Sequence, residues 1–441
     1  MKTDVDLKDV VAQLLEESRK QGATAAEADV SVVTGLSVNV RMGDVETIEY
    51  NKDRGVGLTV YIGDRSGSAS TSDFSARAIK ETVTAACGIA KYTQEDEYSG
   101  LAEAELMAYD YPDLDLHHHW DVSPEKAIEL GMACESAARE EDTRITNSEG
   151  ASVSTHEGFR VYGNSHGFMG AYHSSRHGVS CAVIAQSGES MQRDYWYSTA
   201  RNSDELDDVE EVGRVAAQRA VARLNARQLS TRQVPVIFSC DVSSSLVSSF
   251  LGAIRGDSLY RKSSFLLDSL GETVFPGFFS IREEPHLKGA LGSAPFDGEG
   301  VRTQNRTYVQ DGIVQSYILD GYSARKLGMQ NTGNAGGVHN LIVKPGNNDL
   351  SAMMKEMGEG LVITELMGQG VNRVTGDYSR GATGFWVEQG EIAYPVEEIT
   401  VAGNLRDMFR EIAAVGSDVD VRRNVRVGSL LVNGMTIAGG Q

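Results

Sequence analysis

The alternation of apolar and polar residues between positions 30 and 62 constrains the fold of this chain more than any other feature of its sequence. Val30, Val32, Val38 and Val40 recur with a period of two, which is typical of strands with one buried face. Gly43-Asp44 predicts a turn into a strand over 45–50, and a further strand over 57–62 ends at a second Gly-Asp pair. We therefore expect antiparallel strands in this region.

Helical patterns flank these strands. Residues 6–21 carry an apolar stripe that Gly22 ends. Asp73 is predicted to cap a second helix, whose apolar stripe includes Ile79 and Val83. The pattern indicates one α+β unit over about residues 1–92.

The middle of the chain also combines helical and strand-like segments. Residues 93–122 are acidic and poorly periodic, which predicts a connector, and Ser123-Pro124-Glu125 is a strong helix start. Residues 144–186 are expected to form strands with turns at 148–150 and 163–167, followed by a charged helix near 204–225.

Strand-like segments interrupted by glycines predominate in the rest of the chain, after about residue 228. A buried strand is predicted over 234–240, after a boundary near 228–233, and a late helix near 404–415. Four further strand-like segments are expected at 291–314, 337–343, 381–387 and 392–401. The expected fold class is α+β, with an N-terminal α+β region of helices and antiparallel strands followed by a β-rich C-terminal domain. The expected domains are 1–115, a central α/β segment at 116–230 that packs with it, and 231–441.

Charge and composition exclude several functions. Lys and Arg total 41 against 62 Asp and Glu, a formal net charge of −21, so direct nucleic-acid binding is not expected. No apolar run approaches the ~18 residues of a membrane span, and the N-terminus lacks the apolar core of a signal peptide. Four scattered cysteines favour reduced thiols and a cytoplasmic location.

Residues 163–167 match the GxSxG motif of serine hydrolases, with Ser165 as the nucleophile. That motif needs a strand before the serine and a helix after it, whereas the residues that follow here are strand-like. A hairpin turn is the favoured interpretation, and a nucleophilic Ser165 remains the alternative.

Histidines offer a second candidate chemistry. His173 and His177 have the spacing of two metal ligands on a helix, but on a strand they would lie roughly 13 Å apart at ~3.3 Å per residue. His117-His118-His119 lies in the acidic connector, and the HExxH motif of zinc peptidases is absent. Structural or surface histidines are favoured over a metal site.

The polar segment 372–386 is the most informative part of the sequence. It combines Asn372, Asp377 and Arg380 with several glycines and with Phe385-Trp386. We expect the two aromatic residues to lie in a buried strand. For the three polar residues, a functional surface and structural hydrogen bonding are equally supported, since loops on rigid scaffolds carry binding groups.

Several segments together resemble the TldD/PmbA family, long labelled modulators of DNA gyrase, and specifically its PmbA (TldE) branch. The segments that carry this resemblance are 54–58, 67–73, 142–150, 164–168, 191–196, 332–340 and 364–403. The likeness covers nearly the whole chain.

The resemblance implies a missing metal site. The TldD branch has a HExxxH motif on a helix after a central strand, and a later cysteine ligand, which together imply a zinc peptidase. The matching stretch here, 241–257, contains no His, Glu or Cys, and every cysteine lies at or before Cys240. We therefore expect no metal and no cofactor in this chain, with zinc in a TldD-like partner.

By the same resemblance, the chain is expected to be the PmbA/TldE-like subunit of a cytoplasmic zinc metallopeptidase that cuts unfolded peptides, by trimming peptide-antibiotic leaders and degrading an antitoxin. It would form a heterodimer with the TldD-like subunit, or a homodimer when alone, and would shape the substrate chamber. The expected substrate-binding residues lie in loops at 334–340 and 372–381: Asn334, His339, Asn372, Thr375, Asp377, Ser379 and Arg380. The alternatives are an independently active hydrolase or peptidase, and an acidic regulator that binds DNA gyrase.

Overall fold

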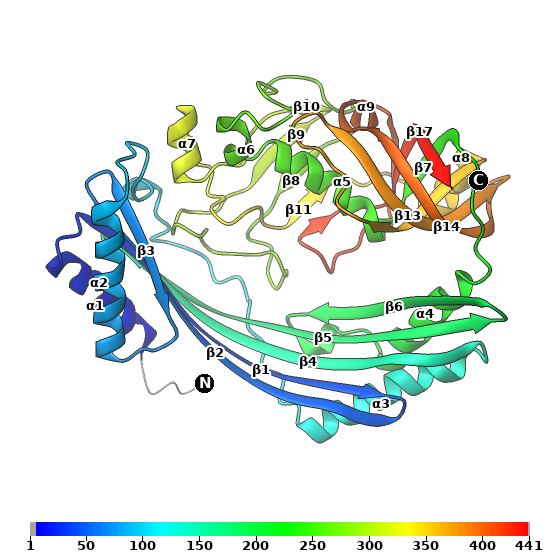
Figure 1. Ribbon diagram of the computed structural model, residues 1–441, viewed down its shortest axis with the longest axis horizontal. Helices are drawn as coiled ribbons and strands as arrows, with labels where there is room; N and C mark the ends of the chain where they lie inside the picture. The colour runs from blue at the N-terminus through cyan, green and yellow to red at the C-terminus, as the bar shows by residue number, and fades with distance from the viewer. Residues whose placement is uncertain (1–5, 440–441) are drawn as a thin grey trace.

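A long curved antiparallel sheet forms one side of the molecule in the computed structural model, which describes residues 6–439 (Figure 1). Its strand order is β3-β2-β1-β4-β5-β6. The strands are β1 (Ala25–Arg41), β2 (Asp44–Ile62), β3 (Arg65–Thr71), β4 (Ile145–Asn164), β5 (Met169–Ser187) and β6 (Ser190–Ala200). Because β1 pairs with β4 along most of its length, the N-terminal and central segments share one continuous sheet.

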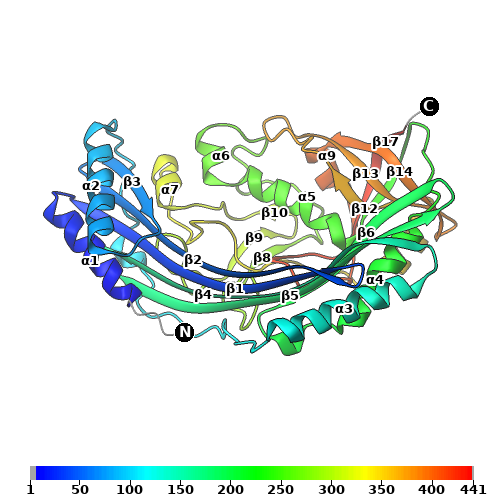
Figure 2. The same cartoon turned by 60° about the horizontal axis from the view of Figure 1, so that its bottom comes forward.

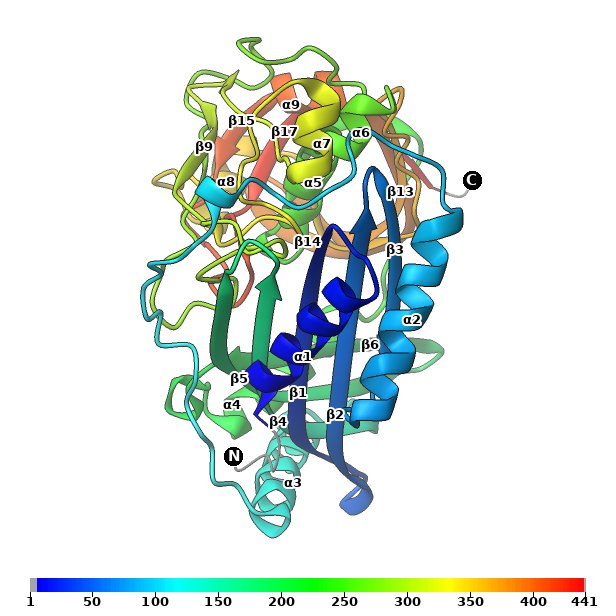
Figure 3. The same ribbon diagram turned by 90° about the vertical axis from the view of Figure 1, so that its left-hand side faces the viewer.

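Two pairs of helices cover the same face of this sheet, at its two ends. The helices are α1 (Leu7–Lys20), α2 (Ala76–Tyr92), α3 (Pro124–Glu141) and α4 (Val209–Ala222). The even-numbered residues of β1 are buried from Ala26 to Val40, except one near the middle of the strand that is half-buried. Those up to Val32 pack in the cluster of α1 and α2, and those from Leu36 pack in the cluster of α3 and α4. Figure 2 shows α3 and α4 below the sheet, and Figure 3 shows α1 and α2 in front of β1–β3.

Local details of the N-terminal half differ from the sequence-based expectations. The strands expected at 45–50 and 57–62 are a single strand, β2, because β1 pairs with both parts and with the residues between them, with one register shift between Asn39 and Val40. Asp73 does not cap α2. Its carboxylate instead accepts hydrogen bonds from the backbone N–H and the hydroxyl of Ser75, and Ser75 is the capping residue. The turn expected at 148–150 is a bulge within β4, where Gly150 has a φ of 105°.

The start of α3 was predicted correctly, whereas α4 begins later than expected. Ser123 caps α3 and Pro124 occupies its first turn. The charged helix expected from 204 begins only at Val209, because Asp208 accepts hydrogen bonds from the backbone N–H groups of Glu210 and Glu211. Residues before it form the short 3-10 helix Ser203–Glu205.

A closed ring of strands organises the C-terminal half. The mixed sheet has the order β14-β13-β12-β7-β17-β15. An additional pairing of β14 with β17 closes the first five of these strands into a ring, and β15 pairs with β17 outside it. Its strands are β7 (Arg232–Phe238), β12 (Gly360–Met367), β13 (Asp377–Glu388), β14 (Glu391–Asn404), β15 (Ile412–Val415) and β17 (Leu430–Gly439). Helix α5 (Cys240–Ala253) follows β7 directly and packs its apolar face into the largest core cluster of the molecule.

A smaller sheet and several short helices complete this half. The sheet has the order β10-β9-β8-β11-β16. These elements are β8 (Ile281–Glu283), β9 (Arg306–Gln310), β10 (Ile313–Val314), β11 (Leu341–Val343), β16 (Val425–Arg426), α6 (Gly256–Tyr260), α7 (Gly321–Leu327), α8 (Leu350–Met357) and α9 (Leu405–Arg410). The strand expected from residue 291 begins only at Arg306, because residues 291–305 form turns and isolated bridges.

Aromatic residues join the long sheet to the C-terminal half. Tyr162 of β4 and Phe168 of the turn before β5 lie in one buried cluster with Phe296 and Val301. The connector contributes Met107 to this cluster, after the short 3-10 helix Ala104–Leu106. The face of the sheet that α1–α4 leave uncovered therefore carries the contacts to the C-terminal half. Within residues 6–439, none of the helices combines the length and the apolar character that crossing a bilayer requires.

Candidate functional site

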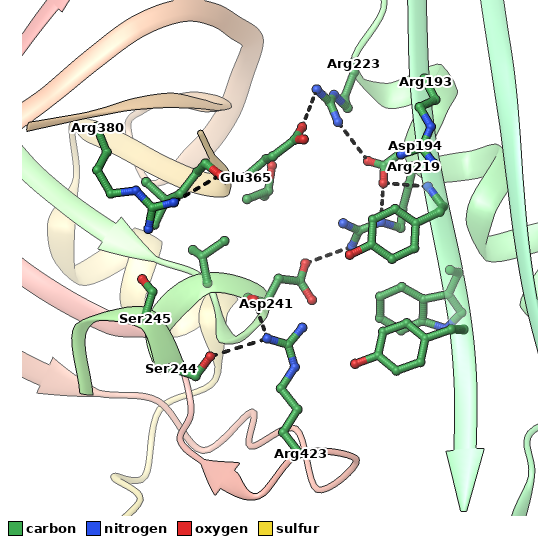
Figure 4. A pocket seen from close by; sticks show the side chains of 16 residues that line it. Arg193, Asp194, Arg219, Arg223, Asp241, Ser244, Ser245, Glu365, Arg380 and Arg423 are labelled. Carbon is green, nitrogen blue, oxygen red and sulfur yellow. Dashed lines mark hydrogen bonds and ion pairs between the residues drawn. The ribbon is translucent and has the colours of Figure 1, made fainter. Parts of the chain in front are cut away.

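A cavity of about 320 Å³ lies where the long sheet, α5 and the C-terminal ring meet (Figure 4). We call it the arginine cavity, because five of the residues that line it are arginines. Its lining residues are Arg193, Asp194, Tyr195, Trp196, Tyr197, Arg219, Arg223, Asp241, Val242, Ser244, Ser245, Thr364, Glu365, Leu366, Arg380 and Arg423. Edge strand β6, the C-terminal end of α4, the first turns of α5 and the adjacent strands β12 and β13 supply most of them.

Ion pairs fix the carboxylates of this cavity. Asp194 lies 3.3 Å from Arg219 and 3.4 Å from Arg223. Arg219 also lies 2.9 Å from Asp241, and Arg223 lies 2.8 Å from Glu365. Burial alone would lower the pKa of Arg219, but the two neighbouring carboxylates, Asp241 first, raise it above its usual value.

Aromatic rings form the wall on the side of β6. The guanidinium of Arg219 lies over the ring of Trp196 at 5.0 Å, and that of Arg422 lies over the same ring at 4.4 Å. Arg422 also donates a 2.6 Å hydrogen bond to the carbonyl oxygen of Tyr197. Cation–π contacts of this kind hold the rings in place, so β6 presents an ordered surface to the cavity.

Arg380 is the exception to the ion pairing. Its Nη2 lies 3.4 Å from the carbonyl oxygen of Leu366, and its buried Nε has no hydrogen-bond partner. Among residues 6–439, no carboxylate lies within 4 Å of its guanidinium. The buried hydroxyl of Ser245, on the second turn of α5, also lacks a partner.

A second cavity, of about 930 Å³, adjoins the first and shares Ser245 and Arg380 with it. We call it the loop cavity, because the loop before β13 contributes more of its lining residues than α5 or β13 does. Four of the residues expected to bind substrate line it: Asn372, Asp377, Ser379 and Arg380.

Hydrogen bonds within that loop fix its shape. Asn372 accepts from the backbone N–H of Val374 at 2.9 Å, and Thr375 donates its hydroxyl to Asp377 at 2.6 Å. The hydrogen bonds from Thr375 and Asn404 lower the pKa of Asp377. Thr375 therefore supports a residue of the loop cavity without lining it.

Asn334 and His339 lie elsewhere. Both hydrogen-bond to Glu283 in the small sheet, Asn334 from its Nδ2 at 2.9 Å and His339 from its backbone N at 2.6 Å. Tyr308 donates its hydroxyl to the same buried carboxylate at 2.7 Å. Neither Asn334 nor His339 is among the residues that line the loop cavity, so the geometry does not bring the 334–340 and 372–381 loops to one rim.

The local structure around Ser165 is that of a hairpin turn. Residues 165–168 join β4 to β5, so a strand follows the serine where a hydrolase elbow requires a helix. The hydroxyl of Ser165 accepts a 3.0 Å hydrogen bond from the backbone N–H of Ala26. The structure thus uses this hydroxyl to attach the turn to β1.

The histidines noted in the sequence have structural partners. His173 stacks on Phe159, and burial lowers its pKa. His177 contacts the hydroxyl of Thr155 at 2.9 Å and the carbonyl oxygen of His118 at 2.8 Å. Within the described part of the chain, no three His, Cys, Asp or Glu side chains are grouped so as to hold a metal ion.

The residues on and after α5 do not fit a catalytic zinc ion. The helix buries Leu246, Val247, Phe250 and Leu251, and its polar side chains are mainly serines. Burial raises the pKa of Cys240 to about 12, with Asp241 contributing, and α5 carries no histidine or glutamate that could complete a zinc site with them. A catalytic zinc site needs about three protein ligands, and this region does not supply them.

Sequence reasoning missed most of the arginine cavity. Only Arg380 was expected at the site, although 191–196 was among the segments that carried the family resemblance. An adjacent arginine and aspartate on a strand were the available signal, but Arg219, Arg223 and Glu365 reach the cavity from distant elements. Their convergence is a property of the tertiary structure.

Three family models match consecutive parts of the chain. They are the PmbA/TldA metallopeptidase domain 1 at residues 26–90, the central domain at 117–224 and the C-terminal domain at 231–439. These matches adjoin near residue 228, where the sequence predicts a boundary.

Curated relatives match along the same length. The chain is 51% identical to the metalloprotease PmbA homolog of Haemophilus influenzae, over 98% of this chain and 96% of that protein. It is also 51% identical to the metalloprotease PmbA of Escherichia coli, with the same coverage. The metalloprotease TldD homolog of Haemophilus influenzae is 23% identical over 86% of this chain and 83% of that protein.

Solved structures share the fold. A protein of Bacteroides thetaiotaomicron described as a modulator of DNA gyrase superposes with a TM-score of 0.94 at 27% identity, covering 100% of both chains. TldE from Thermococcus kodakarensis superposes with a TM-score of 0.85 at 20% identity, over 98% of this chain and 100% of that one. The likeness therefore extends over the long sheet and the C-terminal ring together.

Proposed function

This chain belongs to the PmbA/TldD family of metallopeptidases, and we propose that it is the subunit of a two-subunit peptidase that does not carry the zinc. In this proposal a TldD-like partner supplies the metal site. This chain forms part of the chamber in which an unfolded peptide is held. The proposed location is the cytoplasm, because the four free cysteines suit a reducing compartment.

One observation carries this proposal: the chain has a polar cavity beside α5, and the described residues that line it include no histidine and no cysteine. Asp241, Ser244 and Ser245 of α5 line the arginine cavity. The TldD branch of the family has its HExxxH motif on the corresponding helix. A subunit that lost the ligands while retaining the cavity can still bind and orient a substrate.

The free edge of β12 supports an extended peptide as the substrate. Strand β7 pairs with β12 only over residues 361–363. The next three residues, Thr364, Glu365 and Leu366, line the arginine cavity. A strand edge without a partner offers backbone donors and acceptors that an unfolded peptide can pair with, whatever its sequence. Leader segments of peptide antibiotics and an unfolded antitoxin are substrates of this kind.

The pairing of subunits has support from the relatives. Haemophilus influenzae has both a PmbA homolog and a TldD homolog that match this chain. We propose a heterodimer with the TldD-like protein of the same genome, and a homodimer when this chain is alone.

Co-expression tests the proposal. This chain is produced together with the TldD-like protein of its own genome, and the complex is examined by size and by cleavage of an unstructured peptide. We expect a stable heterodimer that cleaves the peptide and loses activity with a chelator, whereas this chain alone does not cleave. Robust cleavage by this chain alone, or the absence of a complex, would contradict the proposal.

Variants of the complex assign the site. Asp377→Ala and Arg380→Ala are expected to slow cleavage, because both residues line the loop cavity. Arg410→Ala is the matched control, since Arg410 is an exposed residue of α9 that lines neither cavity. Unchanged rates with the first two variants would rule out a role for those residues.

A further inference from the structure

The arginine cavity contains one cation that its neighbours do not balance. Two of its arginines pair outside the cavity, Arg193 with Glu149 at 2.7 Å and Arg423 with Asp420 at 3.1 Å. Arg219 and Arg223 pair with the three carboxylates described above. Arg380 is left, and within residues 6–439 it has no carboxylate partner. An unpaired cation in a half-buried position is notable in a chain with a net charge of −21, where acidic groups are abundant.

Two buried polar atoms without partners in residues 6–439 belong to side chains that line the same two cavities. The Nε of Arg380 and the Oγ of Ser245 are both buried without a hydrogen-bond partner, and both residues line both cavities. A buried polar group without a partner costs free energy, so such a pair points to a ligand that completes it. A guanidinium offers only donors, and a hydroxyl can donate as well. The ligand that fits them is an acceptor with negative charge and two oxygens, which is a carboxylate.

The position of the cavity indicates where on a peptide this carboxylate lies. The unpaired edge of β12 begins where β7 ends, and the chain turns there into α5 at Cys240. A peptide that paired with this edge would meet the start of α5 after about three residues. The edge therefore accommodates the end of a peptide more readily than its middle, and Arg380 selects the negatively charged end.

We propose that the arginine cavity binds the C-terminal carboxylate of an extended peptide, with Arg380 as the charged donor and Ser245 as a second donor. This inference rests on the proposed function, because it takes the peptide of that proposal as its ligand. It specifies which end of the peptide this subunit recognises. Binding involves no covalent step.

Binding of three matched peptides tests the inference. The probes are one unstructured sequence with a dye at its N-terminus, carrying a free C-terminal acid, a C-terminal amide, or an amide after a final glutamate. Affinities are measured for the full chain alone and for the complex with its TldD-like partner. We expect the acid to bind about ten- to a hundredfold more tightly than the amide, the range for a hydrogen bond to a charged group.

Variants assign the effect to the cavity. Arg380→Gln is expected to remove the preference, so that the acid and the amide bind with equal affinity. Arg380→Lys keeps the charge but not the two-pronged geometry, so an intermediate preference is expected. Arg410→Gln is the control and should retain the full preference. Thermal unfolding of each variant checks that it is folded.

Three results would overturn the inference: equal affinity for acid and amide, a preference that survives Arg380→Gln, or no binding of any probe by the chain or the complex. Tight binding of the probe with the final glutamate would assign the cavity to side-chain carboxylates and overturn the assignment to the C-terminus. Cleavage of the amide by the complex, with no preference for the acid, would leave the proposed function standing alone. If the chain prefers the acid but forms no complex with the TldD-like protein, carboxylate recognition would stand and the proposed function would be contradicted.

Discussion

The guanidinium of Arg223, at the end of α4, lies 2.8 Å from the carboxylate of Glu365 in β12. Arg223 also contacts Asp194 of β6 at 3.4 Å. One side chain thus links the edge of the long sheet to the C-terminal ring across the arginine cavity (Figure 4). The shape of the cavity depends on this link, because its two walls belong to different sheets.

Replacing Arg223 should weaken that link. Only 12% of its side chain and 6% of that of Asp194 are exposed, so Arg223→Met leaves a buried carboxylate with one cation fewer. We expect a loss of about 2 kcal/mol in the free energy of unfolding, measured with urea. Arg214→Met is the control, since Arg214 pairs with Glu210 and Glu211 on the exposed side of α4, and its loss should be about 0.5 kcal/mol or less. Equal losses for both variants would contradict this account.

The stability of the protein should fall between about pH 4.5 and pH 8 because of Glu299. Burial, with Asp297 contributing, raises the pKa of Glu299 from 4.5 to about 8. The folded protein therefore holds this proton over a pH range in which the unfolded chain has released it. The resulting stabilisation is complete below the lower pKa and is lost as the pH rises through the higher one, by up to about 1.4 kcal/mol per pH unit.

Glu299→Gln tests this pH dependence. The carboxylate of Glu299 accepts hydrogen bonds from the backbone N–H of Gly321 at 2.9 Å and from Asn331 at 3.2 Å, and a glutamine oxygen can accept both. Urea unfolding at pH 5 and pH 8 should show a smaller loss of stability in the variant than in the wild type. The exposed Glu105→Gln variant is the control. Identical pH slopes in all three proteins would show that Glu299 does not cause the effect.

Two glycine-to-alanine changes in helices should have opposite signs. Gly213 of α4 lies where that helix meets α3, and a Cβ there would overlap the carbonyl oxygen of Cys134. Gly213→Ala should therefore destabilise the protein, by about 1–3 kcal/mol. Gly88 of α2 has nothing within 4 Å of its would-be Cβ, so Gly88→Ala should stabilise it by about 0.5–1 kcal/mol. Thermal and urea unfolding measure both changes, and destabilisation by both would refute the packing argument.

Metal analysis should find this chain without a tightly bound zinc ion. Helix α5 has no histidine or glutamate, and its serines are poor zinc ligands. After dialysis we expect well under one zinc per chain by elemental analysis, and a melting temperature that a chelator does not change. One stoichiometric zinc that resists dialysis would overturn the assignment of the metal to the partner. The co-purified complex serves as the positive control.

Local signals account for the parts of the fold that were predicted well. The period-two burial of β1 and the Ser123-Pro124 start of α3 depend on residues that are close together in the sequence. The merging of two expected strands into β2 could not be seen there, because residues 44–54 are largely exposed and lack a one-sided apolar pattern. Their pairing with β1 makes them a strand.

The candidate site also has parts that the sequence predicted and parts that it did not. The polar loop before β13 was noticeable in the sequence, and Asn372, Asp377, Ser379 and Arg380 do line one cavity. Asn334 looked similar, but the structure surrounds it with Glu283, Tyr308 and Thr332, whose hydrogen bonds occupy its side chain. The residues of the polar loop are accessible from a cavity, whereas Asn334 is buried. Burial of this kind depends on contacts between segments that are distant in the sequence.

The sequence by itself determined the α+β class, the family and the lack of a HExxxH motif in residues 241–257, because each depends on residue types at neighbouring positions. Only the tertiary structure decided that five arginines surround one cavity and that, within residues 6–439, Arg380 is the one among them without a carboxylate partner. Ion pairing is a matter of distances of a few ångströms between side chains. Those distances are set by how β6, α4, α5 and β12 pack against one another, which no local pattern encodes.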